Sequence, residues 1–382
     1  MRKIVCLATS PWYPIPTRKQ QVMSRIPDAE ILYFDPSVTY LAPLKDKAAR
    51  PGLSNYKKEG VHPQENITVY SLPPVLPFFY KFRWINKLNQ RRMARFVRRK
   101  MREHGFTDVL LWVYSPVTAD LVDLVPHKGL VYDCVDRHSA YGGLMDPALV
   151  DRMELELAGK TDRTFATADA LAERLRAAQP NTVMIPNGAN FERFVQAAQP
   201  QPVPEDLRDI PHPIFGFVGA LQSCIEYGYL EAAAKARPDW SFVLIGKEKP
   251  GVDLSALHAM PNVHFLGLKP NEQLPQYLAH FDACLNLFAK SDLSKDVSPL
   301  KFYEYLATGR PIVSTKQPDQ ILQYAPLIEI ADSQEEFISA CEKSCSDTAP
   351  EQIDARIEAG RACSWDSRVA QMCGILEGQG IL

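Results

Sequence analysis

Short, continuous apolar runs alternate with helical patterns along the whole chain. Seven runs in the first half predict strands, at residues 4–8, 31–34, 67–72, 109–113, 130–133, 163–167 and 183–185. Six more follow at 214–218, 242–245, 263–266, 283–287, 312–314 and 327–330. Helical patterns between the later runs include 229–236, 272–280 and 300–308. Runs this continuous are typical of strands buried on both faces. The pattern therefore predicts an α/β chain with two doubly wound domains.

A proline-rich, polar stretch at residues 196–213 separates the two series of strands and has the composition of a linker. The charge also changes there. Residues 1–195 contain 28 Lys and Arg against 20 Asp and Glu, whereas residues 196–382 contain 15 against 25. We therefore expect one basic domain over residues 1–200 and one acidic domain over residues 205–360.

The overall composition is that of a soluble globular protein, with 46% hydrophobic and 23% charged residues and a net charge of -2. No window reaches the ~18 apolar residues of a transmembrane helix. The first apolar run, residues 4–8, is shorter than the ~7–15 residues of a signal-peptide core. The eight cysteines show no spacing typical of a zinc module or a disulfide framework. A reduced cytoplasm is the expected compartment.

The segment DVSPLKFYEYLATGRPIVST (296–315) predicts a helix that begins beside an anion site. Ser298 is a favourable N-cap and Pro299 suits the first helical position. Helix N-termini attract anions, and Lys301 in the first turn is favourable there once an anion is bound. Glu304, on the same face, can accept hydrogen bonds from hydroxyl groups. A site that binds phosphate next to a pair of hydroxyl groups suits the diphosphate and ribose of a nucleotide. The alternative is that Lys301 and Glu304 form only a surface ion pair.

The segment from residue 73 to 105 is strongly basic and contains an aromatic cluster, with Glu103 as its acidic residue near the end. Its basic residues are Lys81, Arg83, Lys87, Arg91, Arg92, Arg95, Arg98, Arg99, Lys100 and Arg102. Such a segment suits an anionic membrane surface, and the expected contacts are Phe78, Phe79, Trp84, Arg91, Arg95 and Arg98. A solvated helix face is the alternative. Nucleic acid is not expected, because no recognised binding module accompanies the charge.

Residues 299–315 (PLKFYEYLATGRPIVST) closely resemble the donor-site helix of GT-B glycosyltransferases, above all the bacterial enzymes of the teichuronic-acid and xanthan glucuronosyltransferase type. Other stretches resemble this family in the same order: 16–26, 131–141, 183–194, 215–221, 236–247 and 262–288. Residues 364–372 (SWDSRVAQM) resemble its closing helix, which implies that 361–382 return to the N-terminal domain. The resemblance spans nearly the whole chain and implies two Rossmann-like domains facing across a cleft.

The resemblance also implies a donor site in the second domain. Glu304 matches the residue that holds the nucleotide ribose, and Lys301 one that contacts the donor pyrophosphate. The full implied set is Gly219, Leu268, Asp296, Ser298, Leu300, Lys301 and Glu304. Many family members carry an Arg-x4-Lys pair after the loop at Gly219, and this sequence has no basic residue there. Lys301, helped by Lys247, is then expected to neutralise the phosphates.

Acceptor binding and catalysis are expected in the first domain. Trp12 and Arg18 stand where the family has a glycine-rich loop and are expected to contact the acceptor, together with His138. Asp136 and then Asp133 are the candidates for the base that takes the proton of the acceptor hydroxyl, because both lie at the carboxyl end of a buried strand. The alternative is that one of them caps the following turn or pairs with Arg137.

Together these observations predict a glycosyltransferase that transfers a sugar from a nucleotide-diphosphate sugar, with UDP favoured, to a lipid-linked saccharide in cell-surface polysaccharide assembly. The sequence has no Asp-x-Asp triplet, GxGxxG motif or P-loop, so neither a metal nor a cofactor is expected. The expected location is the inner face of the cell membrane, as a peripheral protein. Two alternatives remain open: a UDP-sugar 2-epimerase, and a catalytically degenerate scaffold that docks at membranes.

Overall fold

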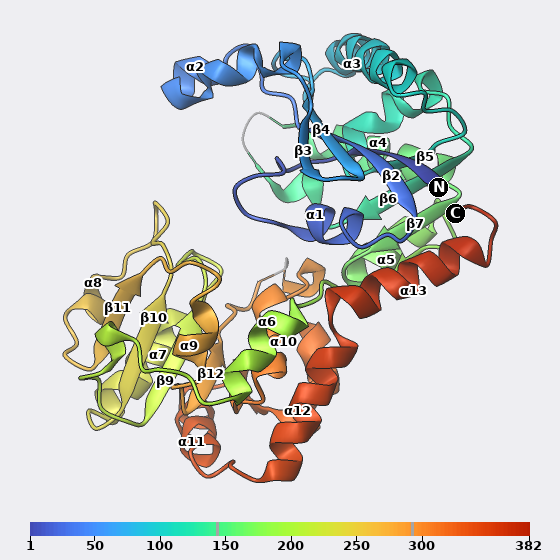
Figure 1. The fold of residues 1–382 in the computed structure, drawn as a ribbon. Coiled ribbons are helices and arrows are strands. Elements are labelled where there is room, and N and C mark those ends of the chain that lie inside the picture. Colours follow the sequence, from blue (N-terminus) through green and yellow to red (C-terminus); the bar gives the residue numbers. More distant parts are fainter. Residues whose placement is uncertain (143–144, 292–293) are drawn as a thin grey trace. The chain divides into compact units, whose positions relative to one another are not determined.

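The computed structural model describes residues 1–142, 145–291 and 294–382 and divides into two compact units (Figure 1). Unit 1 comprises Met1–Pro186 with Val369–Leu382, and unit 2 comprises Asn187–Arg368. Each unit is built around its own, mainly parallel sheet. Within the described ranges, no helix is long and apolar enough to span a bilayer.

The sheet of unit 1 has eight strands. Their spatial order is β3 (Val61–Gln64), β4 (Ile67–Ser71), β2 (Ala29–Asp35), β1 (Arg2–Leu7), β5 (Leu110–Val113), β6 (Gly129–Cys134), β7 (Arg163–Ala166) and β8 (Val183–Met184). All pairs are parallel except β3 with β4. Every residue of β5 and the last four of β1 are buried, so both faces of the sheet are covered, as the continuous apolar runs predicted.

The helices assigned to unit 1 are α1 (Arg18–Met23), α2 (Ala42–Lys45), α3 (Arg83–Glu103), α4 (Pro147–Lys160), α5 (Asp169–Arg176) and most of α13 (Trp365–Glu377). Helix α3 packs through its apolar stripe, with Met93, Phe96 and Val97 in the same core cluster as residues of α4 and α5. These positions recur at helical spacing, so the polar positions between them face solvent. That geometry turns the basic side of α3 outward.

The sheet of unit 2 is fully parallel. Its order is β11 (Val263–Gly267), β10 (Ser241–Ile245), β9 (Ile214–Val218), β12 (Ala283–Asn286), β13 (Ile312–Thr315) and β14 (Glu329–Ala331). The surrounding helices are α6 (Phe191–Phe194), α7 (Tyr227–Ala236), α8 (Ser255–His258), α9 (Leu274–Leu278), α10 (Leu300–Thr308), α11 (Gln334–Ser344) and α12 (Pro350–Ala362).

Side chains of β9 alternate between two cores, as the two-residue period of a strand requires. Ile214 and Val218 pack with α9 and α10, whereas Phe215 and Phe217 pack with α7 and α11. The fold of both units is thus the doubly wound α/β arrangement that the sequence predicted.

The division between the units falls at Pro186 and Asn187, earlier in the chain than the proline-rich stretch 196–213. The physical reason is burial. Phe191, Phe194 and Ala197 lie in the core cluster that contains α10, so the residues before and within the expected linker are part of unit 2. The last fourteen residues, Val369–Leu382, belong to unit 1.

Candidate functional site

Three neighbouring strands of unit 2 each have a glycine at their carboxyl end, so no side chain of these residues covers the backbone there. Gly219 follows β9, Gly246 follows β10 and Gly267 ends β11. The amide of Gly219 donates to the carbonyl of Ile245 at 2.8 Å, and that of Gly246 to the carbonyl of Gly267 at 2.9 Å. A Cβ on Gly246 would lie 1.8 Å from the Gly219 carbonyl oxygen, so this approach requires glycine. Ligands of open parallel sheets bind at this edge.

The side chain of Lys301 fills the space above Gly219. A Cβ on Gly219 would come within 2.3 Å of Lys301 Cε. The Lys301 ammonium lies 4.7 Å from the ring centre of Phe217 and 5.7 Å from that of Phe288. Burial lowers the pKa of Lys301, and the neighbouring Cys224 and Glu304 partly oppose that shift. In the described part of the chain the ammonium has no ion pair or hydrogen bond, so its donors can serve an anion.

Glu304 lies three residues after Lys301 in α10. Burial raises its pKa to about 7, although the positive charges of Lys301 and Arg193 act in the opposite direction. Because the surroundings of this carboxyl group are poorly solvated, they destabilise its ionised form. Such perturbed groups cluster at functional sites, which marks Glu304 as a candidate for ligand contact.

Arg193 of α6 is a charged neighbour of Glu304 that the sequence analysis did not single out. It forms an ion pair with Glu272, with Nη2 and Oε1 3.6 Å apart. The stretch 183–194 carries part of the family resemblance, and nothing in its spacing indicates that Arg193 lies near α10. Its proximity to Glu304 arises from the packing of α6 on α10.

Helix α10 covers the predicted pattern 300–308, but its N-cap lies one residue after the expected Ser298. Its N-cap is Pro299, and Ser298 does not cap it. Instead, Ser298 Oγ accepts a hydrogen bond from the Asn187 amide at 2.9 Å, and the Ser298 carbonyl accepts one from Asn187 Nδ2 at 3.1 Å. The expectation of a Ser298 cap is therefore wrong, because its hydroxyl secures the start of unit 2 to this loop.

The remaining predicted donor residues have different surroundings. Asp296 is buried in the 3-10 turn Ser294–Asp296, just before α10. Leu300 is exposed at the first position of α10, and Leu268, which follows β11, is 72% exposed. Thus Lys301 lies against Gly219 and interacts with Glu304, and Asp296 and Leu300 lie near the start of the same helix.

In unit 1, Asp133 and Arg18 form a buried ion pair. Arg18 Nε donates to both carboxylate oxygens of Asp133, at 2.9 and 3.1 Å, and Nη1 donates to the Pro186 carbonyl at 2.9 Å. Neither side chain is more than 4% exposed. Both groups therefore already have a partner inside unit 1, which favours a positioning role for them over direct contact with an acceptor.

Asp136 follows β6 and is exposed, and its Oδ2 accepts a hydrogen bond from the Tyr141 hydroxyl at 2.9 Å. Of the two aspartates it is the one that a substrate can reach. Lys19, beside Arg18, is buried; that burial lowers its pKa, whereas Asp136 and Asp133 act to raise it. Lys19 is thus a second charged residue near a candidate catalytic aspartate that the sequence did not predict.

The other two expected acceptor contacts are also buried. The ring of Trp12 packs edge-on against Tyr33, with ring centres 4.9 Å apart. His138 lies with Nδ1 3.9 Å from Oε1 of the buried Glu154, and burial lowers its pKa, which favours the neutral ring. Glu154 also accepts a hydrogen bond from the Tyr132 hydroxyl at 2.5 Å. This buried network supports the loop that carries Asp136.

The expected membrane residues divide by exposure. Trp84 is 67% exposed, Phe78 is 42% exposed, and Arg91, Arg95 and Arg98 lie on the outer side of α3. Phe79, in contrast, is partly buried against the core of unit 1, and its ring is tilted relative to that of Tyr80, with ring centres 4.4 Å apart. Phe79 is therefore less available to a membrane than Phe78, whose backbone has a positive φ of 65°, and contact of both rings with a membrane stays a prediction.

Comparison with known proteins shows similarity in sequence and in fold. Residues 212–347 match the family described as glycosyl transferases group 1. Over 279 residues the chain is 25% identical to TuaH of Bacillus subtilis (strain 168), whose name assigns it to teichuronic acid biosynthesis as a glycosyltransferase. That match covers 69% of this chain and 70% of TuaH.

Several solved structures share the fold over nearly the whole length. Sucrose-phosphate synthase from Thermosynechococcus elongatus matches with a TM-score of 0.71 and 13% identity, covering 99% of each chain. The UDP-forming α,α-trehalose-phosphate synthase from Burkholderia vietnamiensis matches with 0.69 and 13%, covering 99% of this chain and 100% of the other. Anabaena HepE, solved in complex with UDP and glucose, matches with 0.63 and 16%, covering 99% and 100%. The chain therefore has the GT-B fold, and its residues 212–347 form a glycosyltransferase group 1 domain.

Proposed function

We propose that this protein transfers a sugar from a nucleotide-diphosphate sugar, with UDP as the nucleotide, to a saccharide acceptor in cell-surface polysaccharide assembly. One observation carries the proposal: the partly buried ammonium of Lys301, with no carboxylate paired to it in the described residues, lies against the bare backbone of Gly219. The names of the relatives support it, since TuaH is assigned to teichuronic acid biosynthesis and HepE was solved with UDP and glucose.

The donor chemistry follows from charge. Negative charge develops on the leaving diphosphate as the sugar departs, and the first turn of α10 with Lys301 stabilises it. A bound diphosphate favours the protonated form of Lys301 and so opposes the effect of burial. Glu304 accepts hydrogen bonds from the ribose hydroxyls. Since these groups supply the stabilisation, the proposed reaction needs no metal.

On the acceptor side, Asp136 is the proposed base, because its carboxylate is exposed whereas that of Asp133 is engaged by Arg18. The proposed acceptor is lipid-linked. Unit 1 would approach an anionic membrane from the cytoplasmic side through the outer face of α3, where Trp84 stands beside the arginines. Such a placement brings a membrane-bound acceptor to the unit that carries Asp136.

The donor proposal is tested by calorimetric titration with UDP. The native protein should bind UDP, and Lys301→Ala should weaken binding about 10–150-fold, the equivalent of one charge-assisted hydrogen bond of ~1.5–3 kcal/mol. Lys343→Ala is the matched control, because Lys343 is an exposed lysine of α11 whose carboxylate neighbour is Glu329. Unchanged UDP affinity in folded Lys301→Ala would overturn the assignment of Lys301.

The alternatives predict other outcomes. Failure of the native protein to bind UDP would favour the degenerate scaffold over an enzyme. Conversion of a UDP-sugar to its epimer without an acceptor would favour the 2-epimerase. Release of UDP that depends on an acceptor saccharide supports the glycosyltransferase.

A further inference from the structure

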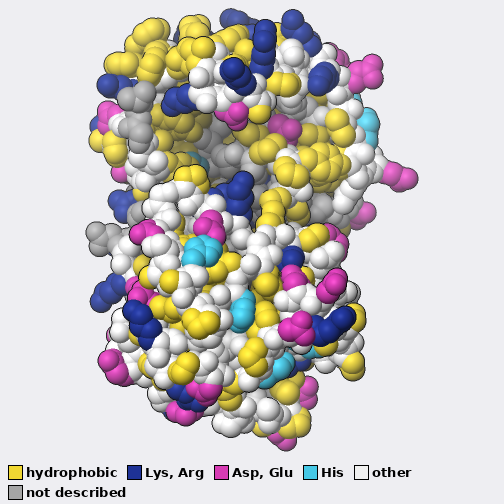
Figure 2. Space-filling model, turned by 90° about the vertical axis from the view of Figure 1, so that its left-hand side faces the viewer, with side chains coloured by type: hydrophobic (Ala, Val, Ile, Leu, Met, Phe, Trp, Pro, Cys, Tyr) yellow, Lys and Arg dark blue, Asp and Glu magenta, His cyan; other side chains and the backbone are white. Residues whose placement is uncertain are grey.

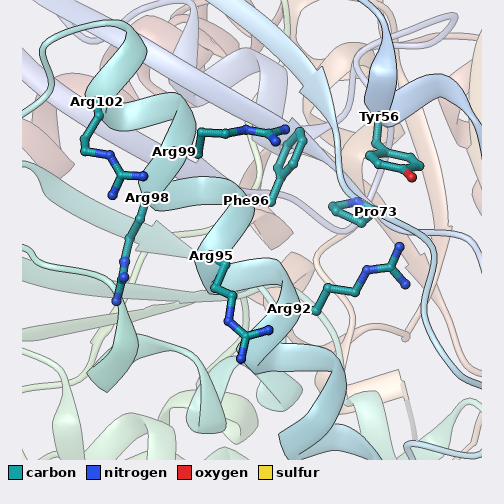
Figure 3. A pocket seen from close by; sticks show the side chains of 8 residues that line it. All are labelled: Tyr56, Pro73, Arg92, Arg95, Phe96, Arg98, Arg99 and Arg102. Carbon is teal, nitrogen blue, oxygen red and sulfur yellow. The ribbon is translucent and has the colours of Figure 1, made fainter.

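A pocket of about 430 Å³ lies along α3 and is lined by five arginines, with no acidic residue in its wall (Figure 3). Its lining residues are Tyr56, Pro73, Arg92, Arg95, Phe96, Arg98, Arg99 and Arg102. Figure 3 shows the arginines projecting from successive turns of α3, with Arg92 reaching toward Tyr56 and Pro73. The volume falls in the range of about 300–1,000 Å³ that small-molecule sites occupy.

Few groups of the protein neutralise these charges. Arg99 is 3.5 Å from Glu103, which also pairs with Lys100 at 2.7 Å. Arg92 donates to the Tyr40 hydroxyl at 2.5 Å. Within the described ranges, the other three pocket arginines have no ion pair and no hydrogen bond; they are Arg95, Arg98 and Arg102.

The spacing of these arginines along α3 destabilises the helix when no anion is bound. Positions 92, 95, 99 and 102 are three or four residues apart and so lie on one side of the helix, where like charges repel. The helix dipole favours basic residues only in the last turn. It accounts for Arg102 at the end of α3 but not for Arg92 and Arg95. An anion in the pocket would offset this repulsion.

Guanidinium groups bind phosphate through paired hydrogen bonds, so phosphate is the anion that this lining fits best. The neighbouring surface indicates its source. Trp84 and Leu88 are exposed on the preceding turns of α3, and Leu44 of α2 is 82% exposed. Tyr40 lies two residues before the start of α2, and its hydroxyl accepts the hydrogen bond from Arg92 in the pocket wall. Figure 2 shows hydrophobic and basic side chains beside one another on unit 1, at the top of the view.

Exposed apolar side chains next to phosphate-binding arginines match the boundary of a bilayer, where head groups and acyl chains meet. A soluble polyanion would leave those side chains in water. We propose that the arginine pocket of α3 binds the phosphomonoester head group of a membrane lipid, while the apolar side chains of α2 and α3 enter the bilayer beside it. This inference rests on the proposed membrane association and adds a lipid preference to it.

The preference follows from charge. A phosphomonoester carries about −1.5 to −2 charges and three acceptor oxygens, whereas a phosphodiester carries one charge. A pocket with several unpaired arginines should bind the more highly charged phosphomonoester more tightly. A flat basic surface should instead bind any vesicle according to the total charge of its surface. Vesicles with equal surface charge and different head groups therefore separate the two cases.

The experiment is flotation with phosphatidylcholine vesicles that contain either phosphatidic acid or phosphatidylglycerol, adjusted to the same zeta potential. The pocket variant combines Arg95→Gln, Arg98→Gln and Arg102→Gln. The control variant combines Lys81→Gln, Lys87→Gln and Arg91→Gln, which removes the same charge from exposed positions outside the pocket. The native protein should prefer phosphatidic acid at least about tenfold, as expected for one more charge-assisted hydrogen bond.

The pocket variant should lose this preference, while the control variant should bind both vesicles more weakly and keep it. Equal binding of the native protein to both vesicle types, or the same effect of both variants, would overturn the proposal. Binding of glycerol 3-phosphate as tight as that of the vesicles would place the ligand in solution and also overturn it. UDP affinity, a property of unit 2, should be native in both variants, so failure here leaves the donor proposal intact.

Discussion

Lys301 lies so close to Gly219 that a Cβ at position 219 would fall 2.5 Å from the Lys301 Nζ. The lysine can occupy its place over β9 because residue 219 has no side chain. We predict that Gly219→Ala displaces Lys301 and weakens UDP binding at least about tenfold, which corresponds to ~1.4 kcal/mol. The measurement is UDP calorimetry on the folded variant.

Gly251→Ala is the matched control for that substitution. Gly251 also has a positive φ, +88°, but a Cβ there meets nothing within 4 Å. Both variants carry the backbone strain of alanine at positive φ, and only one touches Lys301. In the double variant Gly219→Ala with Lys301→Ala, the second change should add little further loss. Full additivity would show that the two residues act separately.

A second prediction concerns Glu304 and pH. Its pKa is about 7 in the native state, raised by burial from an ordinary value near 4.5, so the native state holds a proton that the unfolded state has lost between these values. The free energy of unfolding therefore falls as pH rises from about 4.5 to 7. Glu304→Gln removes this effect and should raise Tm at pH 8 but not at pH 4.5, while weakening UDP binding.

Thermal unfolding at both pH values checks this prediction. Glu231→Gln serves as the control, since Glu231 lies on the surface of α7 with Lys235 as its partner. A Tm gain for Glu304→Gln of equal size at both pH values would contradict the assigned titration. A gain at pH 8 joined to weaker UDP binding is the signature of a side chain placed for a ligand at the expense of stability.

The two aspartates after β6 should behave differently when changed to asparagine. Asp136→Asn should lower transfer about 10²–10⁴-fold, because it removes the proposed base. Being exposed, this side chain should affect stability by no more than about 0.5 kcal/mol. Asp133→Asn should instead lower the free energy of unfolding by roughly 3–5 kcal/mol, since it leaves the buried Arg18 charge uncompensated.

Steady-state transfer assays and denaturant titrations of both variants separate these effects. Full activity of Asp136→Asn would assign the base to Asp133 or exclude an enzymic base. The second outcome would favour a retaining mechanism in which the departing phosphate takes the proton.

The fourth prediction concerns Trp84. Attraction of arginines to anionic lipid is screened over ~8–10 Å at ordinary salt, whereas insertion of an aromatic ring is not. Binding to anionic vesicles should therefore fall with salt to a remainder, and Trp84→Ala should abolish that remainder. Leu322→Ala, which removes an exposed apolar side chain of unit 2, should leave it unchanged. A remainder that survives Trp84→Ala would exclude this residue as the anchor.

The sequence predicted most strands because a parallel strand that is covered on both faces has apolar side chains at consecutive positions and so appears as an unbroken apolar run. It did not predict β3, whose residues Val61–Gln64 include a proline and are mostly exposed. That strand exists only through its pairing with β4 at the sheet edge, a tertiary contact without a local signal. The N-cap of α10 differs from the expected Ser298 for a similar reason, since the amide of Asn187, 111 positions away, donates to the Ser298 hydroxyl.

The candidate donor site was predictable where its residues are neighbours in sequence. Lys301 and Glu304 are three residues apart, so the sequence could place them on one face of α10, although spacing alone left a surface ion pair as the alternative. Arg193 and Lys19 were not predictable, because their relation to Glu304 and Asp136 arises from packing between distant segments. The same holds for Glu154, which meets His138 and Tyr132 only in the folded core.

Unit 1 is discontinuous, and this shapes how the protein can be synthesised. Its first 186 residues and its last fourteen are separated by the whole of unit 2. The final segment closes onto the beginning: Arg2 pairs with Glu377 at 2.5 Å, and Arg163 Nε donates to Gln379 at 2.8 Å. At ~5–20 residues per second, a ribosome synthesises that segment roughly 10–40 s after residue 186. During that interval the sheet of unit 1 lacks the contacts that Arg2 and Arg163 make with this segment, so unit 1 completes its folding only after unit 2 has been synthesised.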